Sequence, residues 1–410
     1  MNFQTRPIEL LAPAGNFEKL EIAAHYGADA VYLANKEFSL RNFSGNFTLD
    51  EMEKAISFSH KTNIKVYVAC NIYARNQDQP GIDDYLKNLG RIGPDALIFA
   101  DPGVFLSARN LIPDIPLHLS TQANTTNYHA VQFWETLGVK RVNVARELSL
   151  EEIKEIRRKT SAEIEAFVHG AMCISYSGRC LLSSFLTKRD SNQGKCSHPC
   201  RWNYAVVEEL RPGKFMPIEE DSRGSYIFNS KDLCMIEHIP EMIQAGITSF
   251  KIEGRMKTIN YLASTVKVYR EAIDSYCSAP ETYQVKKEWI EQLCSITHRD
   301  YCTGFYFNDP DQVTPNYQNA NPLKGHTFIG KILENTVQGL TLTEVKNKIF
   351  VHDPVEIITA KGPLHLDKIH EIINSSGRKI EFSQPGSIVN IRFETAYHKN
   401  DLIRITGERT

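Results

Sequence analysis

The fold of this chain is decided by the stretch IELLAPAGNFEKLEIAAHYGADAVYLA, residues 8–34. Its two ends, Ile8–Ala12 and Ala30–Ala34, are short apolar runs of the kind that form buried strands. Between them, Asn16–Tyr26 repeats apolar residues at a helical spacing, and Asn16 is well placed as the helix N-cap. The stretch therefore predicts a strand–helix–strand unit.

The same alternation runs through the first two-thirds of the chain. Helix-like segments separate the further strand-like runs, which are Ile64–Cys70, Asp95–Asp101, Leu117–Gln122, Arg141–Arg146, Glu163–His169 and Thr248–Glu253. Eight strands alternating with helices predict an α/β protein whose catalytic domain, residues 1–307, is a (β/α)8 TIM-like barrel. A doubly wound open sheet is the alternative, because periodicity does not report whether a sheet closes.

The last gap of this pattern is far longer than the others. Residues 170–247 form an insertion before the final strand, and it contains five of the nine cysteines, at positions 173, 180, 196, 200 and 234. An odd number of cysteines without a secretory signal argues against a disulfide framework. Because an insertion after a barrel strand leaves from the catalytic face, we expect this one to be functional. Cys70 and Cys277 are expected to be small buried residues.

The chain changes character after the barrel. The polar stretch NDPDQVTPNYQNANP, residues 308–322, begins a predicted linker that ends at residue 325. From residue 326 to 410, short strands such as FIGKILE, GLTLTEV and IVNIRF alternate with turn residues. This pattern predicts a small C-terminal all-β barrel domain.

Composition narrows the functional classes. The chain has 47 Lys and Arg against 49 Asp and Glu, so no overall basic field indicates a nucleic-acid partner, and an RNA site would have to be a local patch. No apolar run approaches the length that spans a bilayer. With no secretory signal either, we expect a soluble, cytoplasmic protein with no membrane partner. The sequence leaves the oligomeric state open.

The clustered cysteines point to a soft metal centre. Thiolates are the ligands of iron–sulfur clusters, whereas structural zinc sites usually take their cysteines in C-x2-C pairs, which this segment lacks. The spacing therefore favours an iron–sulfur cluster on Cys173, Cys180, Cys196 and a fourth thiolate, either Cys234 or Cys200. A zinc site, or several unrelated buried thiols, are the alternatives.

One segment carries a resemblance to a known family. EAFVHGAMCISYSGRCLLS, from Glu165 to Ser183, has the spacing Glu-x-Phe-x-x-Gly-Ala-x-Cys-x6-Cys-x-x-Ser. It resembles the signature of the collagenase-like peptidase family of unassigned catalytic type, number thirty-two in its class. Five other blocks resemble the same family: ELLAPAG at 9–15, GADAVY at 27–32, NSKD at 229–232, KIEGR at 251–255 and TGFY at 303–306.

The resemblance implies an activity that the residues alone do not. With one small β domain, the chain most resembles the tRNA branch of the family, which implies oxygen-independent hydroxylation of tRNA to 5-hydroxyuridine at the wobble position. It implies a 4Fe–4S cluster on four cysteines, and prephenate, a small dicarboxylate, as the hydroxyl donor. Both choices of fourth ligand occur in the family, and we favour Cys234. The family name implies the alternative activity, that of a collagenase-like peptidase.

A dicarboxylate donor needs cations at the barrel mouth. The predicted catalytic residues are Lys251 and Arg255, at the end of the last strand, together with His169. The predicted substrate-binding residues come from strand ends, rim loops and the family blocks, and are Arg41, Gln122, Arg146, Asn229, Lys231 and Glu253. Each cation has an alternative role in a rim salt bridge, for instance Lys251 with Glu253. His169 has the alternative of a buried structural histidine.

Three function classes follow from these features. An RNA hydroxylase has a local patch of basic and aromatic residues around the cysteines: Lys188, Arg189, Lys195, Arg201, Phe185, Trp202 and Tyr204. A peptidase would rely on a Cys173–His169 dyad, because the chain has neither a G-x-S-x-G nor an H-E-x-x-H motif. The third class is a metal-stabilised RNA-binding protein without catalysis.

Overall fold

The fold is seen in a computed structural model, which describes residues 8–36, 38, 46–172, 176, 177, 179, 180, 182–187, 189, 197, 219–221, 224–226, 231–308 and 326–406. Several predicted site residues lie outside these ranges: Arg41, Asn229, Cys173, Cys196 and Cys200. The predicted linker, apart from its first residue, also lies outside them. The pattern of strands and helices can therefore be checked over most of both domains.

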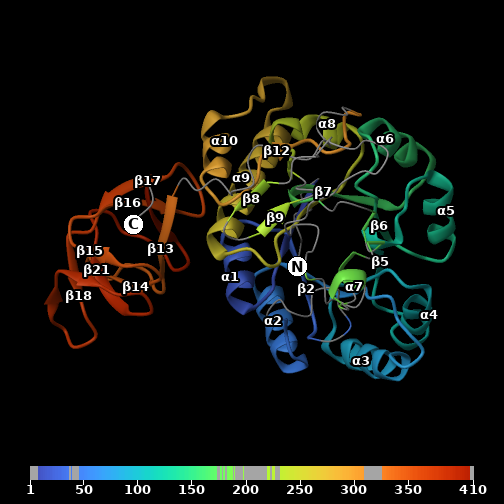
Figure 1. Cartoon of the computed structure of the whole chain (residues 1–410), viewed down its shortest axis with the longest axis horizontal. Coiled ribbons are helices and arrows are strands. Elements are labelled where there is room, and N and C mark those ends of the chain that lie inside the picture. The colour runs from blue at the N-terminus through green and yellow to red at the C-terminus, as the bar shows by residue number, and fades with distance from the viewer. Residues whose placement is uncertain are drawn as a thin grey trace.

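Eight parallel strands form a closed barrel (Figure 1). In chain order they are β1 (Glu9–Pro13), β2 (Ala30–Ala34), β3 (Lys65–Cys70), β4 (Ala96–Phe99), β5 (Leu117–Leu119), β6 (Arg141–Asn143), β7 (Glu163–Ala171) and β11 (Ser249–Ile252). β11 pairs with β1 on one side and with β7 on the other. The second pairing closes the sheet, so the predicted TIM-like barrel is confirmed and the open sheet is excluded.

Helices cover the outside of the barrel (Figure 1). They are α1 (Phe17–His25), α2 (Leu49–Lys61), α3 (Gln79–Ile92), α4 (Pro102–Leu111), α5 (Tyr128–Thr136), α6 (Leu150–Lys159), α8 (Ile239–Gln244), α9 (Ile259–Ser278) and α10 (Lys287–Cys294). Asn16 caps α1 as predicted, because its side chain accepts the N–H of Lys19 at 2.9 Å. None of the helices in the described ranges is long and apolar enough to cross a bilayer.

Charged side chains occupy the barrel interior at the N-terminal ends of the strands. Arg141, at the start of β6, donates to Glu163 at 2.6 Å and also pairs with Glu9, which accepts the Tyr67 hydroxyl at 2.6 Å. Burial alone would raise the pKa of Glu9, but the Arg141 guanidinium outweighs burial and holds that pKa below its ordinary value. Charge pairs at this end serve stability, because this end of a TIM barrel is opposite the catalytic face.

A neutral histidine lies in the same part of the barrel interior as Arg141. His118, on β5, packs edge-on against the Tyr67 ring with centroids 4.8 Å apart, and its Nδ1 atom has no hydrogen-bond partner in the described part of the chain. Burial, followed by the positive charges of Arg141, Lys251 and Lys65, holds the pKa of His118 well below its ordinary value. His118 is therefore uncharged in the folded barrel at neutral pH.

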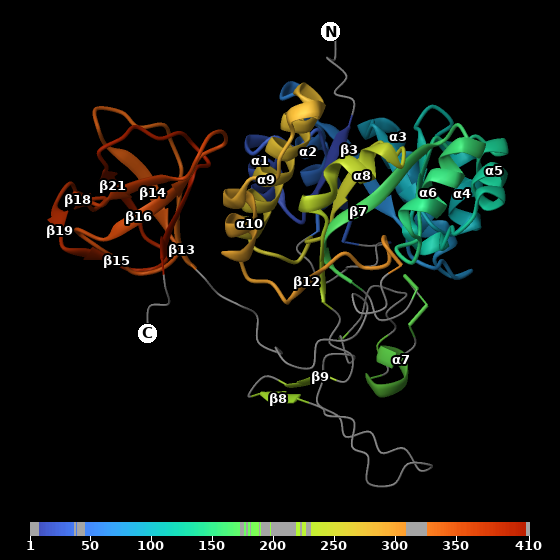
Figure 2. The same cartoon turned by 90° about the horizontal axis from the view of Figure 1, so that it is seen from above.

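β7 runs on beyond the barrel and carries the root of the insertion. β10 (Asp232–Cys234) pairs antiparallel with the last part of β7, and β12 (Tyr301–Cys302) pairs with β10. The short elements α7 (Leu182–Thr187), β8 (Glu219–Asp221) and β9 (Gly224–Tyr226) lie on the side where the barrel strands end (Figure 2). The insertion thus leaves from the expected face.

The two cysteines expected to be small buried residues differ. Cys70, at the end of β3, is buried, and that prediction is confirmed. The prediction for Cys277 is wrong, because this residue lies near the C-terminal end of α9 and is exposed there. Helical periodicity predicted the helix but not that its last turn leaves the core.

The C-terminal module, residues 326–406, is the predicted all-β domain. Its main sheet is antiparallel, with the order β17-β16-β22-β13-β14-β21-β18-β19. The bounds are β13 (His326–Ile332), β14 (Thr341–Val345), β16 (Pro354–Ile358), β17 (His365–Lys368), β18 (Glu371–Ile373), β19 (Lys379–Ile380), β21 (Ile388–Arg392) and β22 (Leu402–Thr406). β15 (Ile349–Phe350) and β20 (Phe382–Ser383) form a separate ribbon. In the described residues no pairing joins β17 to β19, so the module is an antiparallel half-barrel.

Buried polar contacts dock the module on the helices beside it (Figure 2). Tyr26 of α1 donates to the carbonyl of Ile358 at 2.6 Å, and Lys267 of α9 donates to the carbonyl of Thr359 at 2.7 Å. Arg404, which is 1% exposed, donates to the Ser295 hydroxyl at 2.6 Å. Because such groups would be costly if they were left unpaired, these bonds hold the module to the barrel domain.

Replacing His118 tests whether this buried imidazole makes the barrel sensitive to acid. Below a pH of about 6.5 the unfolded chain takes up a proton at His118 that the folded chain does not. The contribution of this group to stability is therefore present above pH ~6.5 and is lost below it, by about 1.4 kcal/mol per pH unit. When the pH is lowered from about 7.5 to about 5.5, we expect the free energy of unfolding of His118→Gln to fall by about 1 kcal/mol less than that of the wild type. Urea titrations at the two pH values measure the difference. An equal loss in both proteins would show that His118 is not the acid-sensitive group.

Candidate functional site

The described site residues are held in three different places. Lys251 lies inside the barrel, whereas Gln122, Arg146 and Arg255 lie in the loops at its rim. His169 faces helix α9 on the outside of the barrel wall. The sequence therefore predicted the right end of the barrel for most of these residues, but not how each is held.

Lys251 is buried in an ion pair and is not free at the mouth. Its Nζ atom lies 2.6 Å from Oε1 of Glu165, and the two side chains are only 6% and 3% exposed. The ammonium also lies 4.7 Å from the centre of the Tyr32 ring. The partner of Lys251 is thus Glu165, which opens the family-like signature, and not Glu253. Its contacts are those of a lysine that neutralises a buried carboxylate.

Arg146 ties down the first residues of the insertion. Its guanidinium donates to the carbonyl of Ala171 at 3.0 Å and to the hydroxyl of Ser177 at 2.8 Å. It also lies over the Phe167 ring, 5.2 Å from the centroid. Ala171 and Ser177 stand on either side of Cys173 in the sequence, so Arg146 anchors the segment that contains this predicted ligand. Carboxylate binding by Arg146 stays a prediction.

Loops after β3 and β5 meet the insertion at the rim. Asn124, which has φ 52°, donates to the carbonyls of Gln122 at 3.0 Å and Ser177 at 3.2 Å. Tyr73 donates to the same Gln122 carbonyl at 3.0 Å. Gln122 thus contributes its backbone to this junction. Neither Asn124 nor Tyr73 was predicted, because no motif marks them. The asparagine that follows a short polar turn is the one local signal in the sequence that could have indicated Asn124.

The rim beside α1 brings together two cations, one of which was not predicted. Arg255, which is 4% exposed, donates to Oδ1 of Asn46 at 2.7 Å, and its carbonyl accepts Nζ of Lys19 at 2.9 Å. A Cβ atom on Gly15 would lie 2.8 Å from the same carbonyl, so this approach requires glycine. Burial, and then the charge of Arg255, lowers the pKa of Lys19. Lys19 stands 236 residues from Arg255, and no local pattern relates them.

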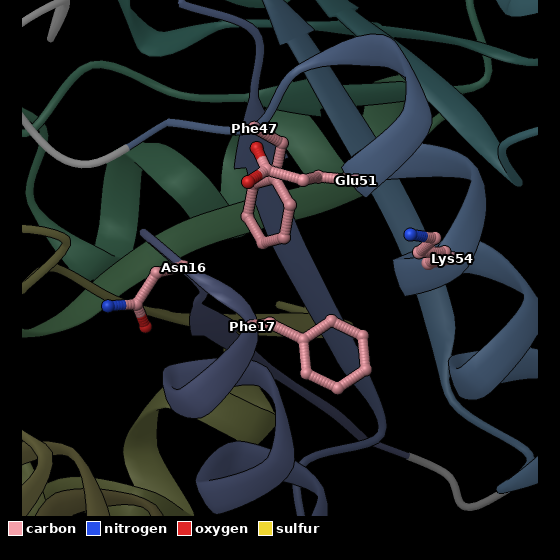
Figure 3. Close-up of a pocket in the computed structure, with 5 residues that line it drawn as sticks. All are labelled: Asn16, Phe17, Phe47, Glu51 and Lys54. Atoms are coloured by element: carbon pink, nitrogen blue, oxygen red, sulfur yellow. The ribbon is translucent and has the colours of Figure 1, made fainter.

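A cavity of about 490 Å³ lies beside these loops (Figure 3). Its described lining comes from the segments that begin α1 and α2: Asn16, Phe17, Phe47, Glu51 and Lys54. Glu51 is engaged in a capping box with Thr48. With one charge of each sign in this lining, the cavity has no pair of cations that would hold a dicarboxylate.

Gly170 decides how the end of β7 meets the end of β11. This residue has φ 109°, and a Cβ atom on it would lie 2.5 Å from the carbonyl oxygen of Glu253. The N–H of Glu253 donates to the carbonyl of His169 at 2.8 Å, and Tyr261 donates to the Glu253 carbonyl at 3.0 Å. The glycine of the family-like signature is therefore required by a close backbone contact, and Glu253 is fixed beside the root of the insertion.

A bulge turns His169 away from the barrel interior. The register of β7 with β11 shifts after Phe167, which faces Lys251, so that His169 instead faces Ile252. Such an extra residue inverts the alternation of side chains. Tyrosine rings surround the imidazole at centroid distances of 5.4 to 5.7 Å, those of Tyr261, Tyr269 and Tyr301.

His169 is neutral in this enclosure. It is 1% exposed, and burial, followed by the charges of Lys257 and His298, lowers its pKa to about 3. Its Nε2 atom has no hydrogen-bond partner among the residues that the structure describes. A general base needs to reach the proton that it removes. The enclosure favours the alternative of a buried structural histidine.

Cys234 is the candidate ligand whose surroundings are best defined. It lies opposite His169 in the pairing of β7 with β10. Burial raises the pKa of its thiol to about 12, whereas hydrogen bonds from the Ile236 N–H and the Tyr269 hydroxyl act in the opposite direction. Donors aimed at sulfur stabilise a thiolate and accompany the sulfur ligands of iron–sulfur clusters. The donor set at Cys234 therefore fits such a ligand.

The rest of the predicted ligand set is only partly described. Cys180 is half-buried, and Cys173, Cys196 and Cys200 lie outside the described residues. Within the described ranges, no group of three or more His, Cys, Asp or Glu side chains is arranged to hold a metal ion. The cluster stays a prediction, and so does the choice between Cys234 and Cys200.

A second cavity, of about 260 Å³, opens beside Cys234. Two further thiols line it, those of Cys294 and Cys302. The charge of Lys231 opposes the rise in the pKa of the Cys302 thiol that burial causes. Substrate binding by Lys231 stays a prediction.

The predicted RNA patch lies mostly outside the described residues. Arg189 is described and is exposed, and α7 contains Phe185. Lys188, Lys195 and Arg201 fall outside the described ranges, as do both remaining aromatic residues, Trp202 and Tyr204. Contact with RNA through this patch stays a prediction.

Sequence comparison shows what the chain is similar to. The pattern of Peptidase family U32 matches residues 15–315, and that of the Peptidase family U32 C-terminal domain matches residues 324–404. The tRNA hydroxylation protein P1 of Bacillus subtilis is 40% identical over 98% of this chain and 95% of its own length. The tRNA hydroxylation protein P of Escherichia coli is 38% identical over 88% of each chain. A collagenase of Porphyromonas gingivalis is 27% identical over 89% of each.

Among solved structures, the U32 peptidase Mk0906 is similar to part of this chain. It is 14% identical, with a TM-score of 0.41, and the match covers 62% of this chain and 96% of that one. The barrel assignment rests on the strand pairing of this chain itself.

Replacing Lys251 tests whether it acts through Glu165. Methionine keeps the length of the side chain but leaves the Glu165 carboxylate buried without its nearest cation, which costs roughly 3–5 kcal/mol of unfolding free energy. Adding Glu165→Gln removes the unpaired charge, so the double variant should recover most of that loss. Urea unfolding of the wild type and both variants measures the effect. If Lys251→Met unfolds within about 1 kcal/mol of the wild type, Lys251 has another role.

Proposed function

The chain belongs to peptidase family U32, and we propose that it is an oxygen-independent, iron–sulfur-dependent tRNA hydroxylase. It forms 5-hydroxyuridine at the wobble position with prephenate as the hydroxyl donor. One observation carries the proposal: relatives that are 34–40% identical over most of this chain are named tRNA hydroxylation proteins. An enzyme that acts on tRNA agrees with the predicted cytoplasmic location.

The insertion and β10 supply the ligands of the proposed 4Fe–4S cluster. These are Cys173, Cys180 and Cys196, with Cys234 as the fourth. Cys234 is the fourth ligand that we favour, because the Ile236 N–H and the Tyr269 hydroxyl lie where they can donate to its thiolate. When bound, the cluster supplies electron-transfer chemistry at the catalytic face of the barrel.

Two cations at the rim support an anionic co-substrate. Prephenate carries carboxylates, which bind Arg and Lys side chains. Lys19 and Arg255 are joined by a hydrogen bond of 2.9 Å between Nζ and the Arg255 carbonyl, and the charge of Arg255 lowers the pKa of Lys19. Two positive charges that repel each other gain from an anion between them. We propose that this pair binds one carboxylate of the donor.

The end of the barrel where the parallel strands stop is where we place a nucleobase that has left its stack. Enzymes that modify a base turn it out of the stack and into a pocket. The rim loops and the described elements of the insertion lie on the side where the barrel strands end (Figure 2). The wobble uridine enters at this end, and basic and aromatic residues of the insertion contact the neighbouring nucleotides.

Proteolysis is the second candidate, favoured by the similarity to a collagenase. A cysteine peptidase needs a base that takes the proton of its nucleophile. His169 is the candidate base, but it is enclosed by tyrosine rings, and its Nδ1 atom lies 3.4 Å from the Tyr269 hydroxyl. This environment does not favour a Cys–His dyad. An RNA-binding protein without catalysis is the third candidate, and it would leave tRNA nucleosides unmodified.

Anaerobic purification tests the cluster. We expect about four iron and four sulfide per chain. Cys180→Ser and Cys234→Ser should each lose most of the iron, because a cluster rarely survives the loss of a thiolate ligand. Cys277→Ser is the matched control, since this thiol is exposed at the end of α9 and should not affect the iron content. Zinc, or no metal, in the anaerobically purified wild type would rule out the cluster.

Nucleoside mass spectrometry tests the reaction and the donor site. In a bacterial strain whose tRNA lacks 5-hydroxyuridine derivatives, expression of this chain should restore them. In a host that also makes no prephenate, expression of this chain should not restore them. Lys19→Met should lower the restored level about tenfold, because it removes one of the two rim cations. Lys61→Met, in the exposed last turn of α2 and outside the cavity lining, should have no effect. If the tRNA stays unmodified and the purified chain cleaves collagen, the result would support the peptidase instead.

A further inference from the structure

The hydroxyl of Tyr269 lies where the strands around Cys234 meet. Tyr269, on α9, has an exposed fraction of 0%. Its hydroxyl donates to the carbonyl of Val168 on β7 at 2.7 Å and accepts the N–H of Met235, just after β10, at 2.9 Å. The same oxygen lies 3.9 Å from Sγ of Cys234 and 3.4 Å from Nδ1 of His169. One phenol thus contacts both strands and the sulfur.

We propose that Tyr269 is a positioning residue for the Cys234 sulfur, which it hydrogen-bonds when that sulfur is a thiolate ligand. This inference rests on the proposed function, in which Cys234 binds the cluster. Tyr269 does not touch the substrate or take part in catalysis directly. Its role is to hold one ligand in place and to set the electrostatic environment of that sulfur.

The Tyr269 hydroxyl can change the group to which it donates its hydrogen bond. A phenol has one proton to donate and also accepts hydrogen bonds through its oxygen. While Cys234 is a thiol, the Tyr269 O–H donates to the Val168 carbonyl, which lies 2.7 Å away and is much nearer than the sulfur. When the sulfur is a thiolate, the O–H turns toward it and forms the stronger, charge-assisted bond. The Val168 carbonyl is not left unpaired, because the Met235 N–H also donates to it at 3.0 Å.

His169 supports the phenol from the side. Its ring packs against the Tyr269 ring with centroids 5.5 Å apart, in an edge-on arrangement. The register of β10 on β7 places His169 directly opposite Cys234. The buried position of His169 is therefore explained by its contact with Tyr269, without a role as a general base.

A hydrogen bond to a ligand sulfur has measurable consequences. It stabilises the more negative, reduced state of a cluster and so raises its reduction potential. It also strengthens the hold on the metal, and loss of such a partner typically weakens metal binding by about 10-fold or more. Removing the phenol oxygen should therefore lower the potential and speed the release of iron.

The test compares Tyr269→Phe with Tyr306→Phe in anaerobically purified, iron-loaded protein. Tyr306 is a matched control because it is also buried and its hydroxyl donates to the Phe167 carbonyl, one residue before Val168, at 2.6 Å. Both variants lose a bond to β7, but the substitution of Tyr269 alone removes a donor from Cys234. We expect Tyr269→Phe to show a more negative midpoint potential and roughly 10-fold faster iron release to a chelator. Tyr306→Phe should match the wild type.

The outcomes separate this inference from the proposed function. Equal potentials and release rates in both variants would overturn the role of Tyr269 and leave the cluster intact. A wild-type protein without iron and sulfide would overturn both. If Tyr269→Phe does not fold, the protein is made with 3-fluorotyrosine at position 269, because a more acidic phenol donates a stronger hydrogen bond and should raise the midpoint potential. An unchanged potential in that protein would overturn the inference.

Discussion

β7 pairs with three strands, β6, β11 and β10, and the positions of the candidate site residues depend on the last two pairings. Its parallel pairing with β11 closes the barrel, and its antiparallel pairing with β10 brings Cys234 opposite His169. Within the pairing with β11, the bulge after Phe167 turns His169 from the barrel interior to α9. Gly170 allows the close contact with Glu253 that follows. A side chain at Gly170 would push the end of β7 away from the end of β11 and would disturb the position of Glu253.

The charged barrel interior is a second constraint. Burying an ion pair gains little or no stability over apolar packing, but removing one partner is costly. Glu165 with Lys251, and Glu9 with Arg141, therefore behave as fixed sets that must be kept together. Burial, and then the positive charges, keep the imidazole of His118 neutral. The family-like signature beginning at Glu165 thus serves the barrel interior at one end and the insertion at the other.

The proposed ligands reach the site from two separate supports. Arg146 and Asn124 fasten the start of the insertion, on either side of Cys173 in the sequence, to the rim loops. Cys234 is instead held on β10, under Tyr269 of α9. A cluster bound by both would join the insertion to the barrel wall, so its loss should affect the insertion more than the barrel. The C-terminal module is fastened separately, through α1, α9 and α10.

The sequence by itself determined the strands and helices of the barrel, the position of the cysteine-rich insertion, the all-β module and the cap at Asn16. These features depend on local periodicity and local hydrogen bonds, which a short stretch of residues specifies. Only the tertiary structure decided that β11 closes on β7, that Lys251 pairs with Glu165, that His169 faces α9 and that Lys19 meets Arg255. These contacts join residues far apart in the chain. They depend on a bulge, a glycine and the packing of loops, which periodicity does not record.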